Sequence, residues 1–134
     1  MIEITNLYKS YDGYPAVSAL SLSMREKEVF GMVGTNGAGK TTLLRMMTGV
    51  LLPDEGSILL DDEAVYENPH AKEKIFFIPD DPYYFPNSRP VDMMKHYGNV
   101  YPEFSEVRFY QLMNDFGLDV RRRIGGFSKG MKKQ

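Results

Sequence analysis

The segment Gly34 to Thr41 has the residue types and spacing of a loop that binds phosphate groups. It reads Gly-Thr-Asn-Gly-Ala-Gly-Lys-Thr and matches the pattern G-x-x-x-x-G-K-[S/T] in full. Glycine reaches backbone angles closed to other residues and carries no side chain, so consecutive N–H groups can converge on phosphate oxygens. We expect the Lys40 ammonium to contact β and γ phosphates and the Thr41 hydroxyl to bind Mg²⁺. The expected nucleotide ligands in this segment and directly after it are Gly34, Asn36, Gly37, Ala38, Gly39, Lys40, Thr41 and Thr42.

The elements on either side of this loop are a strand and a helix, as phosphate binding requires. Val29–Val33 is a continuous apolar run, which is typical of a strand covered on both faces in the middle of a sheet. Ile75–Ile78, ended by Pro79, has the same character. After the loop, a helix beginning near Lys40 is predicted by apolar residues at helical spacing, namely Leu43, Leu44, Met46, Met47 and Val50.

The rest of the chain changes from strands to helices near residues 79–90. Strands are expected around Ile2–Leu7, Leu20–Met24 and Ser57–Leu60. Pro90 suits the first turn of a helix reaching about His96 or Tyr97. Ser105 is a suitable N-cap for a second helix that Gly117 would end. This order of elements indicates an α/β fold.

The composition narrows the classes of function. With 134 residues, 43% of them hydrophobic, the chain fits one soluble domain, and its net charge of -2 argues against a nucleic-acid partner. The absence of cysteine excludes thiolate metal sites and fits a reducing compartment. Nothing in the sequence has the layout of a signal peptide or the roughly 20 apolar residues of a membrane helix. The basic run Arg121–Arg123 is interpreted as part of a solvated face.

Three further motifs resemble the ATP-binding domains of ABC transporters. The first is Tyr8-Lys9-Ser10-Tyr11 followed by Ala19-Leu20, and the second is Thr48-Gly49 followed by Pro53–Ile58. The third is Phe127-Ser128-Lys129-Gly130-Met131, which is similar to the family's signature Leu-Ser-Gly-Gly-Gln. The resemblance covers essentially the whole chain.

Within this family, an aromatic residue upstream of the phosphate loop stacks on adenine, and Tyr11 takes that position. Base–aromatic stacking contributes about 1–3 kcal/mol and discriminates poorly among bases. Tyr8 and Tyr14 are the other candidates. The alternative is that Tyr11 only packs at the end of a strand.

The signature segment implies a site completed by a second subunit. Ser128 and Gly130 match the family pattern, whereas Lys129 and Met131 depart from it. Ser128 is also a suitable N-cap for a helix continuing through Lys132. In the family, this serine faces the γ-phosphate bound to the opposite subunit, so the resemblance implies that Ser128 and Gly130 bind ATP in trans within a homodimer.

Asp80 stands where the family has a glutamine that reaches Mg²⁺ and the attacking water. A carboxylate is also a hard Mg²⁺ ligand, so Asp80 and Thr41 are the expected metal ligands. The equally weighted alternative is that Asp80-Asp81-Pro82 forms only a turn. The substitution resembles variants in exporter ATPases.

The resemblance implies the fold of a P-loop NTPase of ABC type, with a RecA-like core, an antiparallel β subdomain and a partial helical subdomain. We expect residues of about 1–85 to hold the β subdomain and P-loop core, and residues of about 86–134 the helical subdomain and signature. The family's second acidic motif, catalytic glutamate and switch histidine would follow Gln134. No catalytic set is therefore complete in this sequence, and residues 1–134 alone are expected to bind ATP without turnover.

The function that the resemblance implies is that of a motor ATPase, which couples binding and hydrolysis of Mg-ATP to export through a separate multi-span membrane permease. Its location would be cytoplasmic, on the inner face of the cell membrane. The alternative is a nucleotide-binding or regulatory module that does not hydrolyse ATP. A role in translation or DNA repair is disfavoured by the charge, and a GTPase by the absence of a guanine-reading Asn-Lys-x-Asp motif.

Overall fold

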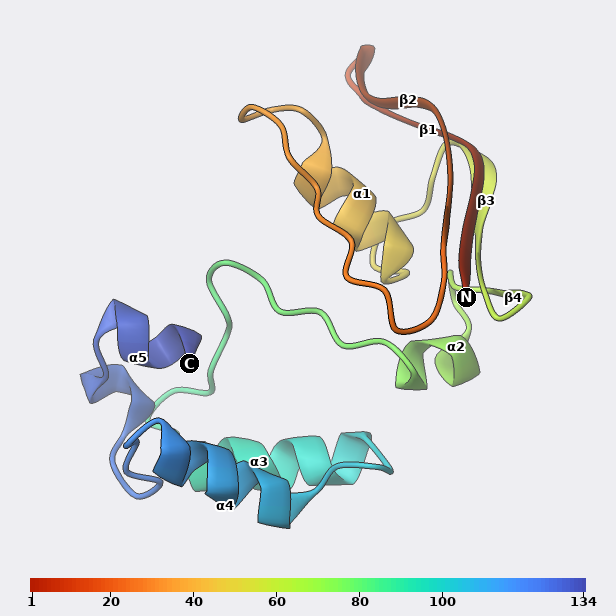
Figure 1. Ribbon diagram of the computed structural model, residues 1–134. Coiled ribbons are helices and arrows are strands. Elements are labelled where there is room, and N and C mark those ends of the chain that lie inside the picture. Colours follow the sequence, from red (N-terminus) through yellow and green to blue (C-terminus); the bar gives the residue numbers. More distant parts are fainter. The chain divides into compact units, whose positions relative to one another are not determined.

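A four-stranded antiparallel sheet forms the framework of the N-terminal unit (Figure 1). The computed structural model describes residues 1–134 and divides them into two units, Met1–Phe77 and Ile78–Gln134. The order of strands in the sheet is β2-β1-β3-β4, and the strands are β1 (Ile2–Tyr11), β2 (Tyr14–Met24), β3 (Glu55–Leu60) and β4 (Glu63–Ala64). The expected antiparallel β subdomain is confirmed.

Strands β1 and β2 form a hairpin with a two-residue turn. Tyr11 pairs with Tyr14, and the turn residues Asp12 and Gly13 have φ values of 49° and 82°. Positive φ at both central residues defines a type I′ turn, whose twist matches that of the strands, and Asp-Gly suits it. The turn thereby sets where Tyr11 lies at the end of β1.

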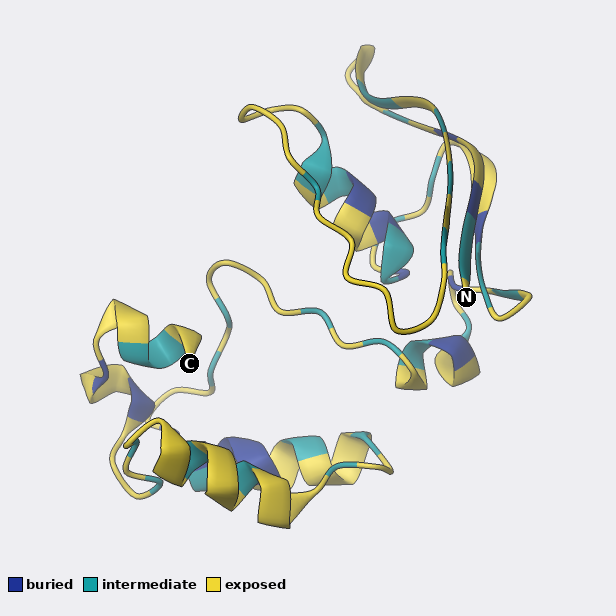
Figure 2. Ribbon diagram, in the orientation of Figure 1, coloured by how far each residue is buried: buried dark blue, intermediate teal, exposed yellow.

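Helix α1 (Lys40–Met47) packs on this sheet and places the phosphate loop at its N-terminus. Leu43 and Met46, three residues apart, are buried in the same cluster as Ile4 and Leu7 of β1 (Figure 2). This is the amphipathic stripe that the sequence predicts, although α1 ends at Met47 and does not reach Val50.

Two predicted strands are absent from the sheet. Residues 29–33 and 75–78 have no strand assignment and no ladder partner within residues 1–134, so these predictions were wrong for the structure described. Parallel strands form only when neighbours supply hydrogen bonds on their edges, and each pairing that this sheet contains is antiparallel. Val29 and Val33 are fully exposed there, whereas Met32 and Ile75 are partly buried against the core of the N-terminal unit.

The C-terminal unit is helical, as predicted. Its helices are α3 (Pro90–Val100), α4 (Glu106–Asp115), the 3₁₀ turn η1 (Ile124–Gly126) and α5 (Lys129–Lys133). The Ser105 hydroxyl accepts a hydrogen bond from Arg108 N–H at 3.2 Å, and Gly117, with φ of 63°, follows α4. Both predicted helix boundaries are confirmed. The sequence did not predict α2 (Pro69–Glu73) in the N-terminal unit.

Candidate nucleotide site

The phosphate loop has a backbone that glycine makes possible. Gly37 and Gly39 have φ values of 85° and 81°, a region that side-chain-bearing residues rarely adopt. A Cβ on Gly39 would lie 2.0 Å from the carbonyl oxygen of Ala16, so the loop also passes directly against strand β2. At Gly34, a Cβ would lie 3.1 Å from that of Ala38. The loop is therefore curled tightly, and its glycines carry no side chain that would cover the backbone.

Lys40 closes the loop from the helix side. Its ammonium donates hydrogen bonds to the carbonyl oxygens of Gly34 at 2.7 Å and Thr35 at 2.8 Å. The side chain thus curls back over the same loop whose N–H groups we expect to bind phosphate. This arrangement places a positive charge against the phosphate loop, which fits an anionic ligand.

The N-terminus of α1 adds to the positive character of the loop. The helix begins at Lys40 with Gly39 as N-cap, and no side chain caps it and no acidic residue occupies its first turn. Unpaired N–H groups and the helix dipole favour an anion at such an end. Thr41 is exposed and Thr42 half-buried in this first turn. The donor set therefore fits the phosphates of a nucleotide and a hard cation beside them.

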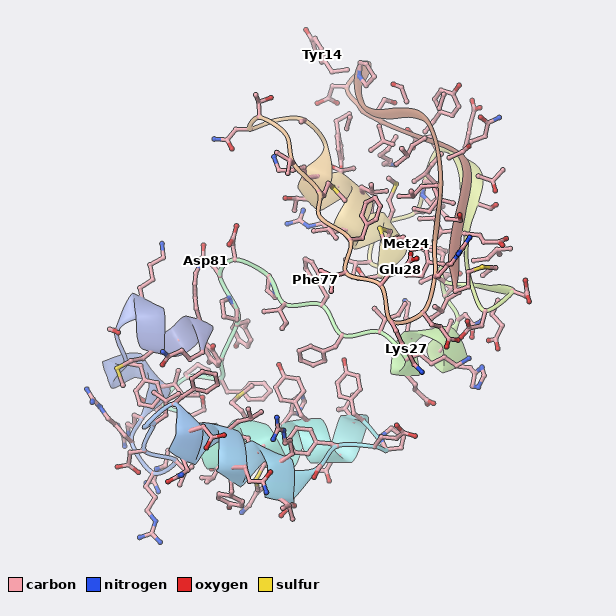
Figure 3. All side chains as sticks on the ribbon, in the orientation of Figure 1. Tyr14, Met24, Lys27, Glu28, Phe77 and Asp81 are labelled. Carbon is pink, nitrogen blue, oxygen red and sulfur yellow. The ribbon has the colours of Figure 1, made fainter.

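Tyr11 lies at the end of β1, on the hairpin whose second strand contacts the phosphate loop through Ala16. The tyrosine side chain is 46% exposed, and the ammonium of Lys9 lies 6.0 Å from its ring centroid. Tyr14, its pairing partner, is more exposed and projects from the tip of the hairpin (Figure 3). An exposed ring is available for stacking, so Tyr11 remains the proposed adenine contact.

Ser128 and Gly130 lie in the C-terminal unit, at the start of α5. The Ser128 hydroxyl accepts a hydrogen bond from Met131 N–H at 3.2 Å, which confirms the predicted N-cap. Phe127 before it is buried, whereas Ser128, Lys129 and Gly130 are exposed. The signature segment is thus anchored by one apolar side chain and presents its polar residues to solvent.

Asp80 also belongs to the C-terminal unit, and its carboxylate pairs with the ammonium of Lys133 on α5 at 3.2 Å. The Asp80 side chain is 98% exposed, so this is a surface ion pair of small stability. Tyr84, four residues on, donates its hydroxyl to the carbonyl oxygen of Lys132 at 2.6 Å, and burial raises the pKa of this tyrosine. The segment with Asp80 is therefore joined to α5 by two contacts that the sequence did not reveal.

No group of three or more His, Cys, Asp or Glu side chains within residues 1–134 could hold a metal ion. A Mg²⁺ ion that accompanies a nucleotide does not need such a cluster, because phosphate oxygens and water supply most of its ligands. A single hydroxyl such as that of Thr41 fits this chemistry.

Comparison with known proteins agrees with this geometry. The family model described as "ABC transporter" matches residues 17–134, which include the phosphate loop and the signature segment. The chain belongs to the ABC transporter family. This confirms the resemblance to ABC ATP-binding domains that the sequence indicated. It also confirms the predicted α/β fold class of ABC-type P-loop NTPases.

Two ABC relatives from Bacillus subtilis (strain 168) align with the whole chain. The ABC transporter ATP-binding protein YtrB is 33% identical, and the chain covers 46% of it. The SkfA peptide export ATP-binding protein SkfE is 30% identical, and the chain covers 58% of it. The chain therefore spans about half the length of these relatives.

A solved structure of an ATP-binding subunit of an ABC transporter has the same fold. It superimposes with a TM-score of 0.87 over 99% of this ABC chain and 58% of its own, at 21% identity. None of the helices within residues 1–134 has the length and apolar character of a membrane span.

Proposed function

We propose that this chain is part of the motor subunit of an ABC transporter, which binds and hydrolyses Mg-ATP to drive a separate membrane permease. The observation that carries the proposal is the curled loop from Gly34 to Lys40 at the uncapped start of α1. Its positive φ values, close backbone packing and inward-turned ammonium are features that phosphate binding uses and that a simple chain reversal does not require.

Different residues of the N-terminal unit bind different parts of the nucleotide. Backbone N–H groups from Gly34 to Gly39 bind phosphate oxygens, and Lys40 exchanges its two carbonyl partners for the β and γ phosphates. Thr41 ligates Mg²⁺, whose charge neutralises the phosphates when it is bound. Thr42 donates to a further phosphate, and Tyr11 stacks on adenine.

The residues of the C-terminal unit act on a second copy. Ser128 and Gly130 at the start of α5 bind the γ-phosphate held by the loop of a partner subunit, so two copies close around two nucleotides. The exposure of both residues supports this role, because nothing in their own unit covers them. Asp80 reaches Mg²⁺ only if it leaves Lys133.

The partner outside the ATP-binding dimer is a multi-span permease, which places the chain on the cytoplasmic face of the membrane. The relative SkfE is a peptide export ATP-binding protein, which supports export as the direction of transport. We assign residues of about 1–85 to the β subdomain and P-loop core and residues of about 86–134 to the helical subdomain.

A second candidate is a module that binds ATP without hydrolysing it. The Asp80–Lys133 ion pair supports this candidate, because the carboxylate at the position of the family's glutamine is paired with an ammonium of its own unit. Release of inorganic phosphate by the full-length protein distinguishes the two functions: the motor releases it continuously, and the module only binds.

The decisive substitution is Lys40→Ala. Removing the ammonium deletes charge-assisted hydrogen bonds to phosphate, so ATP binding should weaken at least about tenfold and phosphate release should fall to background. Equilibrium binding of a fluorescent ATP analogue and phosphate release are measured together in the full-length protein. Lys95→Ala, which removes an exposed cation from α3, is the charge-matched control. Unchanged ATP binding in the Lys40 variant would refute the proposed site.

A further inference from the structure

The side chain of Arg122 lies across the turn that leads into the signature segment. Its Nη2 donates a hydrogen bond to the carbonyl oxygen of Gly126 at 2.5 Å. Its guanidinium carbon lies 5.6 Å from the ring centroid of Phe127. A planar guanidinium can do both at once, since it donates in its plane and stacks with its face. Arg122 is exposed, as the basic run predicted, but its side chain also makes these two contacts.

The turn that Arg122 spans is the 3₁₀ turn η1, which two backbone hydrogen bonds already hold: Gly126 N–H donates to the carbonyl oxygen of Arg123 at 3.0 Å, and Phe127 N–H donates to that of Ile124 at 2.9 Å. It contains Gly125 and Gly126 in succession, and glycine loses more conformational freedom on ordering than any other residue. Ile124 N–H donates to the carbonyl oxygen of Ser88 at 2.9 Å, which fixes the start of the turn. Phe127 fixes its end by burial. Between these two anchors, the hydrogen bond from Arg122 is the side-chain contact that restrains the glycine pair.

The orientation of Ser128 depends on this turn. Ser128 directly follows Phe127, and its hydroxyl already caps α5 through Met131 N–H. A rotation of the Gly126–Phe127 peptide would tilt the start of α5 and move the hydroxyl with it. We infer that Arg122 is a positioning residue, which holds the glycine turn so that Ser128 and the start of α5 meet the phosphate bound to a second subunit. This inference rests on the function proposed above. The contact from Arg122 would preorganise the turn, because less conformational freedom of the glycine pair is then lost when the composite site closes.

The basic run supplies its own matched controls. Arg122→Ala, Arg121→Ala and Arg123→Ala each remove one positive charge within three consecutive positions, but only the first removes the contacts to Gly126 and Phe127. The experiment measures ATP-dependent dimerisation of the full-length protein by sedimentation, together with its kcat for ATP hydrolysis. Binding of a fluorescent ATP analogue reports the loop at Lys40, and the melting temperature reports folding.

Loss of Arg122 should weaken ATP-dependent dimerisation about fivefold and lower kcat to a similar extent, while the two control variants stay within about twofold of the parent. The analogue should bind all four proteins equally, and their melting temperatures should agree. Arg122→Lys keeps the charge but not the planar stacking surface, so it should recover only part of the loss.

Three results would overturn the inference. An equal loss of ATP-dependent dimerisation in all three alanine variants would show an effect of net charge. Unchanged dimerisation and kcat in the Arg122 variant would show that its contacts do not position the signature segment. Dimerisation that does not depend on ATP in the parent would remove the composite site that Arg122 serves. A different measurement would refute the proposed function, namely unchanged binding of the ATP analogue by the Lys40→Ala variant.

Discussion

At the scale of single residues, the phosphate loop depends on one position where space and backbone angle are both restrictive. Gly39 has φ of 81° and lies against the Ala16 carbonyl, which a Cβ would approach to 2.0 Å. Gly13, in the hairpin turn, has nearly the same φ of 82°, but nothing lies within 4 Å of its Cβ position. Alanine substitutions at the two glycines can therefore be compared to separate the energetic cost of a positive φ from the cost of steric crowding.

Gly39→Ala should destabilise the protein by clearly more than Gly13→Ala. The angle alone costs about 1–2 kcal/mol for an L-residue, and at Gly39 the contact with Ala16 must also give way, so we expect an additional loss of at least about 1 kcal/mol. ATP binding should weaken only in the Gly39 variant. Urea denaturation and binding of the fluorescent analogue measure both effects. Equal destabilisation by the two substitutions would show that the loop moves away from β2 without cost.

The residues that sequence analysis identified belong to contiguous motifs. The spacing from Gly34 to Thr41 is local, so the loop and the start of α1 could be predicted. The contacts to Ala16, between Asp80 and Lys133, and between Arg122 and Gly126 could not. Two of them use a backbone carbonyl, which every residue type has, and the third joins residues 53 positions apart.

At the scale of elements, a single carboxylate joins β1 to the start of β3. Asp54, just before β3, accepts hydrogen bonds from the ammonium of Lys9 at 2.5 Å and from Ser10 N–H at 2.7 Å. The Lys9 hydrogen bond, followed by that from Ser10, holds the pKa of Asp54 below its ordinary value of 3.8. A lowered pKa in the folded state means that ionised Asp54 stabilises the fold above that ordinary value. The contribution is lost as the pH falls through the lower folded pKa.

Asp54→Asn should therefore lower stability at pH 7 and make it less dependent on pH in the acid range. The parent and the variant should converge as the pH falls below the ordinary pKa of 3.8, where the parent also loses the charge. Urea midpoints at pH 7, 5 and 3 follow this convergence. Asp62→Asn, in the exposed turn between β3 and β4, serves as the control. A constant difference between parent and variant at every pH would contradict the assigned role of the charge.

The difference between local and long-range interactions explains which elements the sequence predicted correctly. Helices α1, α3, α4 and α5 form largely from local signals, such as the caps at Ser105 and Ser128, and all four were predicted. The runs at residues 29–33 and 75–78 have the composition of strands, but a strand also needs a neighbour from elsewhere in the sequence. Composition alone could not show that this partner is absent from residues 1–134.

At the scale of the whole molecule, most of the apolar run before the phosphate loop is exposed. Val29 and Val33 are fully exposed and Phe30 half so, although such continuous runs are typical of strands covered on both faces. The core of the same unit, around Ile4 and Leu7, forms without them. Val29 and Val33 should therefore be free to bind apolar partners while adding nothing to the stability of the unit, whereas Met32 between them packs against the core.

The double substitution Val29→Ser and Val33→Ser tests this separation in the 134-residue chain. Fluorescence of a dye that binds exposed apolar surface should fall, because two fully exposed apolar side chains leave the surface. The free energy of unfolding from urea denaturation should stay within about 0.5 kcal/mol of the parent, since neither side chain is buried. Ile4→Ser is the opposite control, because Ile4 is buried and its loss should lower the midpoint and raise dye binding. A lowered midpoint in the double variant would instead show that residues 29–33 pack in solution as a strand, in which case the phosphate loop would be supported on both sides.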